Sequence, residues 1–173
     1  MTRGRTSGIA GLFLVCAAWM AIASPTYAAD RVLEMTVSAG GGTGEEVMIV
    51  VWAETTEGDF VKTLHMFSKD KEYFKDMLAW RFKSRNKEPK NYIDGVTGAT
   101  IKWGRKKTVV IPAEKDGVNL LDGTHVLRIE SRVWKGKHYR QFKIALPADY
   151  AGGVHTNKGY AKSVEIKIKN ASK

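Results

Sequence analysis

Cysteine is almost absent from this chain. The one cysteine among 173 residues is Cys16, which lies inside an N-terminal apolar run at residues 9–23. If that run is removed on export, the remaining chain has no thiol. It then forms no disulfide, no cysteine-ligated metal or iron–sulfur site and no Cys/His nucleophile.

Spacings that would support metal binding or hydrolysis are also missing. The four histidines include no pair at i, i+4, and no Gly-x-Ser-x-Gly motif occurs. The Gly-rich stretch "AGGGTGEE" lacks the Gly-Lys-Ser/Thr ending of a P-loop and precedes a strand-like run, so a hairpin loop is favoured. We therefore expect no metal site and no catalytic residues.

The first 28 residues have the organisation of a secretory signal peptide. A basic start, "MTRGR", precedes the apolar run, and "SPTYAAD" ends in small residues after a proline. Thr26 and Ala28 in the −3 and −1 places predict cleavage after Ala28 and export to the periplasm. The apolar run is shorter than the roughly 20 residues of a membrane span. A single domain is expected over residues 29–173.

The remaining chain is basic. Removing 28 of the 173 residues leaves 145, and loss of Arg3 and Arg5 lowers the basic count from 28 to 26 against 18 acidic residues, so the net charge falls from +10 to +8. Runs such as "VEIKIKN" alternate basic with apolar residues, as expected for strands with one hydrated face. Export and the absence of a dense basic block argue against nucleic acid. An acidic protein partner or an anionic lipid surface stays open.

Alternation of apolar and polar residues dominates the rest. Seven runs predict short strands, separated by turn residues, as in an antiparallel sandwich. They are residues 31–39, 46–54, 60–67, 107–112, 124–134, 138–146 and 163–169. Two Asp-Gly turns lie between the fourth and fifth runs.

One segment has helical spacing instead. Residues 68–85, "SKDKEYFKDMLAWRFKSR", predict a single amphipathic helix with Tyr73, Phe74, Met77, Leu78 and Phe82 on its apolar face. Ser68 or Asp70 is its expected N-cap. Residues 86–91, with Pro89, are expected to end the helix.

The segment "NYIDGVTGATIKWG", residues 91–104, is the candidate site. Gly95 and Gly98 allow positive φ or a close backbone approach, and Asp94 can accept hydrogen bonds from amides two residues on. Ala99 leaves the next hydroxyl uncrowded, so the segment presents Thr100 on an open turn. From the residue types alone, a purely conformational role for this turn is the alternative.

Residues 94–100, "DGVTGAT", resemble a known signature. The sequence is similar to the Asp-Gly-x-Ser/Thr-Gly-Ala-Thr motif of exported proteins that receive covalent flavin mononucleotide (FMN) from a flavin transferase, as in flavin subunits of the sodium-pumping quinone reductase. The resemblance implies that Thr100 takes the flavin phosphate as a phosphoester. The motif often continues with a Ser/Thr two residues later, where Lys102 stands here.

More of the chain resembles a family of periplasmic proteins of unknown function that are often encoded beside flavin transferases and membrane redox partners. The matching pieces are "VKTLHMF", "LAWRF", "DGVTGATIKWG" and "LLDGTHVLRIESR". The chain departs from that family at residues 123–125, where Gly-Thr-His replaces a Gly-x-Tyr strand opening, and in "VVIPAEKDG", which lacks a Trp-Asp pair. The resemblance implies a mainly β fold: an immunoglobulin-like antiparallel sandwich of about seven strands with one amphipathic helix.

Two functions are therefore weighed. The first is an exported electron carrier with FMN on Thr100, which works with membrane or periplasmic redox proteins and catalyses no bond chemistry of its own. Its expected cofactor-binding residues are Thr100, Asp94, Gly95, Thr97, Gly98, Ala99 and Trp103. The second is a flavin-free sandwich that binds a partner in a periplasmic complex.

Overall fold

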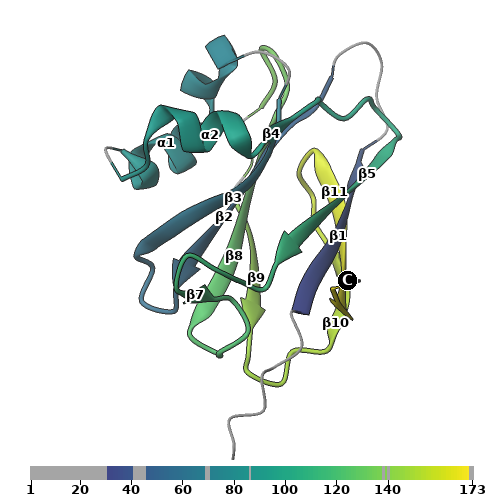
Figure 1. Ribbon diagram of the computed structural model, residues 1–173. Helices are drawn as coiled ribbons and strands as arrows, with labels where there is room; N and C mark the ends of the chain where they lie inside the picture. Colours follow the sequence, from purple (N-terminus) through teal and green to yellow (C-terminus); the bar gives the residue numbers. More distant parts are fainter. Residues whose placement is uncertain are drawn as a thin grey trace, which may run out of the picture.

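The computed structural model folds the chain into two facing β-sheets with short helices on one side (Figure 1). It describes residues 31–40, 46–68, 71–85, 87–137, 139 and 141–171. The expected signal peptide, the Gly-rich loop at residues 41–45 and the candidate N-cap Asp70 lie outside the described residues. The mainly β sandwich expected from the sequence is confirmed.

The first sheet has four antiparallel strands in the order β10-β11-β1-β5. Their bounds are Gly152–Thr156 for β10, Ala161–Asn170 for β11, Arg31–Ala39 for β1 and Lys106–Pro112 for β5. In β1 the alternate residues Leu33, Met35 and Val37 are buried, and Met35 stands opposite Ile166 of β11. The alternation that predicted this strand is the alternation that fills the space between the sheets.

The second sheet has the order β4-β3-β2-β8-β9. Its strands are Thr97–Gly98 for β4, Phe60–Phe67 for β3, Met48–Thr55 for β2, His125–Arg132 for β8 and Phe142–Leu146 for β9. β4 pairs in parallel with β3, and the other pairs are antiparallel. A small hairpin of β6 (Glu114–Lys115) and β7 (Val118–Asn119) turns at Asp116 and Gly117, which both have positive φ and confirm the first Asp-Gly turn.

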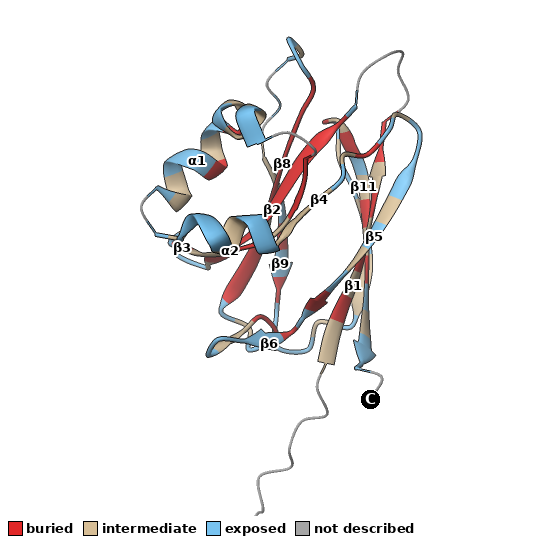
Figure 2. Cartoon of the chain, turned by 45° about the horizontal axis from the view of Figure 1, so that its top comes forward, coloured by how far each residue is buried: buried red, intermediate tan, exposed pale blue. Residues whose placement is uncertain are grey.

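Strand β2 is buried on both faces, as its red ribbon in Figure 2 shows. Ile49, Val51 and Ala53 belong to the core between the sheets. Val50 and Trp52 belong to a second core, between this sheet and the helices. A strand covered on both sides needs a continuous apolar run, which explains "MIVVWA".

The predicted single helix over residues 68–85 is wrong. The chain forms a 3-10 helix, η1 (Lys71–Asp76), and then a separate α-helix, α1 (Leu78–Ser84). Met77 and Trp80 are buried against the sheet, whereas Leu78 and Phe82 of the expected apolar face are exposed. The segment after Pro89, expected to end a helix, begins another, α2 (Lys90–Gly95). Proline is well tolerated at a helix start, where its missing N–H costs nothing.

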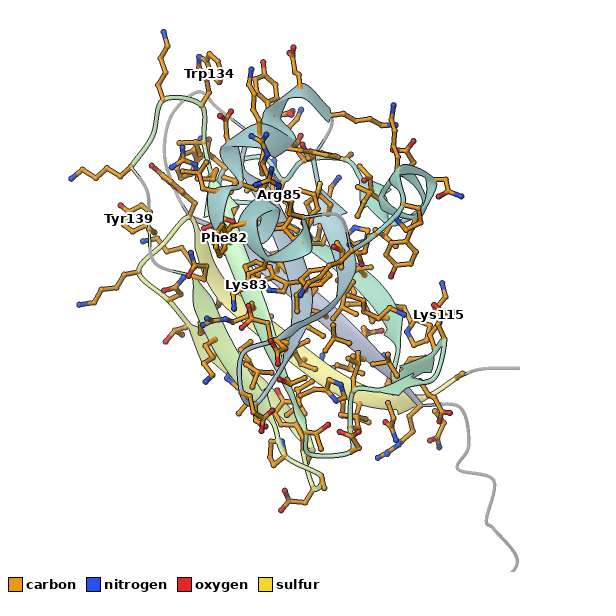
Figure 3. The ribbon with its side chains drawn as sticks, turned by 90° about the vertical axis from the view of Figure 1, so that its left-hand side faces the viewer. Phe82, Lys83, Arg85, Lys115, Trp134 and Tyr139 are labelled. Carbon is orange, nitrogen blue, oxygen red and sulfur yellow. The ribbon has the colours of Figure 1, made fainter. Side chains whose placement is uncertain are left out.

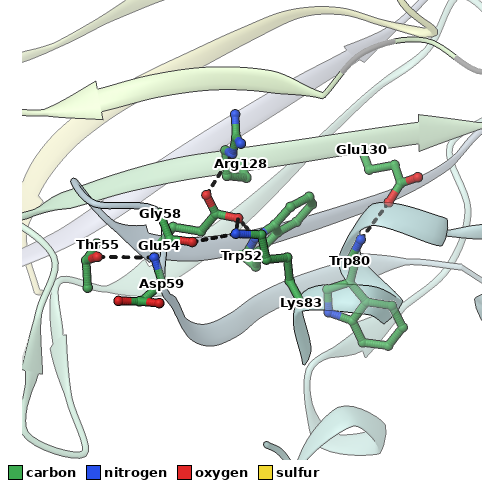
Figure 4. Close-up of polar contacts among 9 residues, drawn as sticks. All are labelled: Trp52, Glu54, Thr55, Gly58, Asp59, Trp80, Lys83, Arg128 and Glu130. Carbon is green, nitrogen blue, oxygen red and sulfur yellow. Dashed lines mark hydrogen bonds and ion pairs between the residues drawn. The ribbon is translucent and has the colours of Figure 1, made fainter. Parts of the chain in front are cut away.

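Two buried carboxylates attach α1 to the second sheet (Figure 4). Glu130 of β8 accepts hydrogen bonds from the backbone N–H of Trp80 at 3.0 Å and of Ala79 at 3.4 Å, so it caps the start of α1 from outside the helix. Glu54 of β2 lies 3.9 Å from the ammonium of Lys83, which also donates to the Gly58 carbonyl at 2.5 Å. The helix is therefore held at both ends by partners distant in sequence.

Candidate functional site

Helix α2 positions the first part of the candidate motif. Asp94 is exposed near its end and forms an ion pair with Lys71 at 2.5 Å. The N–H of Val96, two residues on, donates to the carbonyls of Tyr92 and Ile93 at 3.2 Å each. Asp94 therefore joins α2 to η1, and the amide that it was expected to bind closes the helix instead.

The two glycines of the motif differ in their surroundings. Neither has the positive φ that the sequence suggested. A β-carbon at Gly98 would lie 3.1 Å from Nε2 of His65, so a larger residue there would have to displace the His65 ring by a few tenths of an ångström. A β-carbon at Gly95 would meet nothing within 4 Å. The fold therefore favours glycine at position 98 and leaves space for a side chain at position 95.

Thr97 and its neighbours fix the motif to the sheet. The Thr97 hydroxyl donates to the Ile93 carbonyl at 2.7 Å and so ties β4 to the preceding helix. In the parallel pairing with β3, Met66 N–H donates to the Val96 carbonyl at 3.0 Å and Ser68 N–H donates to the Gly98 carbonyl at 2.9 Å. The backbone is thus held on both sides of Thr97, while Ala99 remains exposed.

Thr100 follows on the segment that crosses from one sheet to the other. Its hydroxyl donates a hydrogen bond to the carboxylate of Glu46. The next residue, Ile101, is buried and pairs with Val47 through two backbone hydrogen bonds of 2.8 and 3.1 Å. Burial of Ile101 leaves the preceding side chain, Thr100, partly exposed on a rigid backbone.

Four basic residues line a surface hollow of about 380 Å³ together with Thr100. Besides Thr100, its lining residues are Glu46, Ala99, Ile101, Lys102, Arg105, Lys106 and Lys107. The ammonium of Lys107 donates to the Ala99 carbonyl at 3.0 Å, which closes one side of the hollow. One carboxylate against four cations makes this hollow suited to an anion such as a phosphate ester. We call it the Thr100 hollow.

A second hollow, of about 190 Å³, opens between β3, α2 and β5. Apolar side chains, among them Leu64, Val109 and Leu120, line it together with Tyr92, Gly95 and His65. The Tyr92 hydroxyl donates to the Thr63 carbonyl at 2.7 Å. Burial, with smaller contributions from Glu88 and Asp116, raises the pKa of Tyr92 to about 12, so its hydroxyl stays protonated.

His65 lines this second hollow and also lies beside the motif. Its ring lies edge-on to Phe67, with centroids 4.4 Å apart, and beside Gly98. Burial lowers the pKa of His65, and the positive charge of Lys107 lowers it further. At neutral pH it is therefore a neutral ring under the motif backbone.

Trp103, the expected aromatic contact for a flavin, lies elsewhere. Its ring packs against the core and meets Tyr160 edge-on, with centroids 5.7 Å apart. It is not among the residues that line the Thr100 hollow. Trp80 of α1 is buried against the second sheet, where its indole N–H donates to the Thr63 hydroxyl at 2.8 Å. Of the aromatic residues near the motif, Tyr92 lines a hollow.

The structure thus brings together Thr100, Ala99 and a set of cations that sequence reasoning missed. The run "IKWGRKK" contains Lys102, Arg105, Lys106 and Lys107, so the sequence could have indicated these basic residues. Glu46 lies 54 residues from Thr100, and no sequence pattern links the two.

Among the described residues, no group of three or more His, Cys, Asp or Glu side chains could hold a metal ion. No helix in the described part of the chain is both long and apolar enough to span a bilayer.

Comparison with known proteins gives a family and no individual relative. Residues 31–163 match a family described as predicted periplasmic protein (DUF2271). Searches of curated proteins and of solved structures returned no match. The match covers the second sheet, the helices, the whole motif and the first sheet up to the start of β11, and it confirms the periplasmic location expected from the sequence. The chain belongs to this family of predicted periplasmic proteins.

Proposed function

We propose that the protein carries FMN covalently on Thr100 and transfers electrons to or from redox proteins of the periplasm or the membrane. When bound, the flavin supplies the redox chemistry, and the protein supplies position and charge. The observation that carries the proposal is the Thr100 hollow, which the partly exposed Thr100 of the motif lines together with four basic residues. A phosphodiester on Thr100 keeps a negative charge, and this lining would stabilise it.

The contacts of Thr100 also suit its modification by another enzyme. A flavin transferase would use a donor whose flavin phosphate is activated as an anhydride. The Thr100 oxygen forms the new P–O bond to the flavin phosphate, the anhydride bond breaks so that the donor's other phosphate group leaves, and the hydroxyl gives up its proton. Glu46 accepts the hydrogen bond of this hydroxyl and is placed to orient it and to receive its proton.

Gly95 supports recognition of the motif by another molecule. The fold leaves open space where its side chain would be, and its backbone angles suit any residue. Asp94, Gly95 and Ala99 are all exposed. A transferase that must approach this backbone closely would require the small residues that the fold does not.

The residues that contact the flavin ring are assigned separately. Tyr92 lines the apolar second hollow, and we propose it as a ring contact on that basis. Trp103 as a ring contact stays a prediction from the sequence. In a chain that carries the flavin, Tyr92→Leu and Trp103→Leu should change flavin fluorescence to the extent that each ring stacks on it.

Co-expression with a flavin transferase tests the attachment. Mass spectrometry should find one phosphoester-linked flavin on the peptide that contains residues 94–102. Thr100→Val, which removes the hydroxyl and keeps the shape, should abolish the adduct without changing the unfolding midpoint. Thr97→Ser should retain it, because that hydroxyl binds the Ile93 carbonyl inside the fold. Thr108→Ala is a matched control on an exposed strand threonine.

Two further variants test the roles of the neighbours. Glu46→Gln should slow attachment while the fold persists, and Lys102→Gln together with Lys106→Gln should lower the yield of adduct. An adduct that persists in Thr100→Val overturns the assignment of Thr100. Absence of any adduct with cognate transferases overturns the electron carrier and favours the flavin-free binding module.

A further inference from the structure

One face of the molecule exposes apolar side chains and cations together. Helix α1 and its C-cap present Leu78, Arg81, Phe82 and Arg85 outward, at the spacing of one helical stripe. Phe82 is 80% exposed and Leu78 54% exposed. An outward stripe would ordinarily be polar, so two large apolar residues on it need an explanation.

A loop between β8 and β9 extends the same face. Trp134 is 46% exposed and meets Tyr73 of η1 edge-on, with ring centroids 5.2 Å apart, so the loop lies against the helical segment. Lys135, Lys137 and Tyr139 of this loop are exposed. Figure 3 shows Phe82, Trp134 and Tyr139 on one side of the molecule, with Arg85 among them. We call this surface the helix–loop face; it comprises Leu78, Arg81, Phe82, Arg85, Trp134, Lys135, Lys137 and Tyr139.

The charges of this face are uncompensated. Within the described part of the chain, Arg81, Arg85, Lys135 and Lys137 form no ion pair. The face itself contains no acidic residue. Its occupant must therefore accept apolar and aromatic side chains and carry negative charge.

We infer that the helix–loop face docks on an anionic lipid bilayer surface. Aromatic and aliphatic side chains flanked by Arg and Lys are the composition of proteins that lie in the membrane interface. Phe82, Leu78 and Trp134 would enter the headgroup region, and the cations would remain beside lipid phosphates. A bilayer surface also suits the shape, because neither hollow described above includes a residue of this face and its side chains project outward.

Vesicle binding by the exported protein tests the inference. Flotation with phosphatidylcholine vesicles that contain about 30% phosphatidylglycerol should recover the protein, and flotation with pure phosphatidylcholine should not. Added salt should weaken the binding. Phe82→Ser should lower the affinity about tenfold, and Arg81→Gln with Arg85→Gln should lower it about fivefold for each charge removed.

Matched controls lie on the opposite sheet. Val154→Ser removes an apolar side chain on β10 that is 66% exposed, and Lys167→Gln with Lys169→Gln removes two charges from β11. Each should change binding by less than about twofold, because distant charges are screened. All variants should keep the wild-type unfolding midpoint, since the substituted side chains are mainly outside the core.

Three results would overturn the inference. The first is an absence of binding to the anionic vesicles at low salt, and the second is an equal loss of affinity in the test and control variants. The third comes from cells in which a photoreactive phenylalanine analogue replaces Phe82, if that residue crosslinks to a protein instead of a lipid. The last result would assign the face to a protein partner.

Discussion

Replacing Glu54 by alanine should lower the free energy of unfolding by about 3 kcal/mol. Glu54 is 2% exposed and has three partners (Figure 4). It accepts hydrogen bonds from the indole N–H of Trp52 and from Nε of Arg128, both at 2.9 Å, and it lies near the ammonium of Lys83. Alanine removes the acceptor of Trp52 and Arg128 and the negative charge beside Lys83, which keeps the Gly58 carbonyl as its acceptor.

The magnitude follows from how far water can reach each partner. The Trp52 indole is buried, so its N–H would be left without an acceptor, at about 2 kcal/mol. The side chain of Arg128 is 26% exposed and that of Lys83 is 37% exposed, so water can replace much of the lost interaction, which leaves about 1 kcal/mol for the pair. Glu54→Gln keeps an acceptor oxygen and loses the charge, so we expect about 1 kcal/mol.

Thermal and urea unfolding, followed by circular dichroism, would measure the effect. A loss of about 3 kcal/mol corresponds to a fall in midpoint of roughly 6–12 °C for a chain of this size. Glu57→Ala is the matched control, because this exposed neighbour has the Thr56 hydroxyl as its side-chain partner and should leave the midpoint unchanged. An unchanged midpoint in Glu54→Ala, or equal losses in the alanine and glutamine variants, would refute the reasoning.

Three further predictions concern the surroundings of the motif. Gly98→Ala should lower the unfolding midpoint, because its methyl group would press on the His65 ring, whereas Gly95→Ala should leave it unchanged or stabilise the helix end by about 0.5 kcal/mol. Lys107→Gln should raise the pKa of His65, measured by NMR titration, since it removes a neighbouring positive charge; an unchanged pKa would contradict this. Burial raises the pKa of Glu88, so ionisation of Glu88 disfavours the folded state. Wild type should therefore lose stability relative to Glu88→Gln as pH rises through and above the ordinary range for glutamate, and urea midpoints measured against pH would show this. A difference that does not depend on pH would contradict this cause.

The long strands could be predicted because each carries its own burial pattern. Leu33, Met35 and Val37 alternate in β1, and the continuous apolar run of β2 reflects burial on both faces. All seven runs identified in the sequence contain a strand of the sandwich. β10 (Gly152–Thr156) was missed because this edge strand pairs with β11 alone and needs no apolar alternation. The two-residue β4 was missed because its pairing depends on β3, about 30 residues earlier in the chain.

The helical segment was mispredicted for a different reason. Periodicity groups apolar residues into a stripe and assigns that stripe to the core. Here Met77 and Trp80 fill the space beside β2, and Glu130 fixes the start of α1, so Leu78 and Phe82 turn outward. The sequence could not show this, because Glu130 and α1 are about 50 residues apart.

The Thr100 site was only partly visible in the sequence. The motif identified the Thr100 hydroxyl and its small neighbours, because these residues are adjacent in the sequence. The acceptor of the Thr100 hydroxyl, Glu46, lies 54 residues earlier in the chain and reaches it only through the fold. Proximity of Gly98 to His65 likewise depends on the pairing of β4 with β3. Local geometry of a motif can be predicted from its residues, whereas its electrostatic surroundings require the packing of distant strands.

The position of the motif bears on how the two proposals combine. In Figure 1 the helices and the segment between β4 and β5, which carries Thr100, lie toward the same end of the sandwich. Figure 3, viewed from the side of the helices, labels Phe82 and Trp134, so a protein that docks through them would place this side against the bilayer. A flavin on Thr100 would lie toward the same end of the sandwich as the docked helices. The two proposals depend on different residues and can be tested separately. Phe82→Ser should weaken binding to vesicles and leave the flavin attached, whereas Thr100→Val should prevent flavin attachment and leave vesicle binding unchanged.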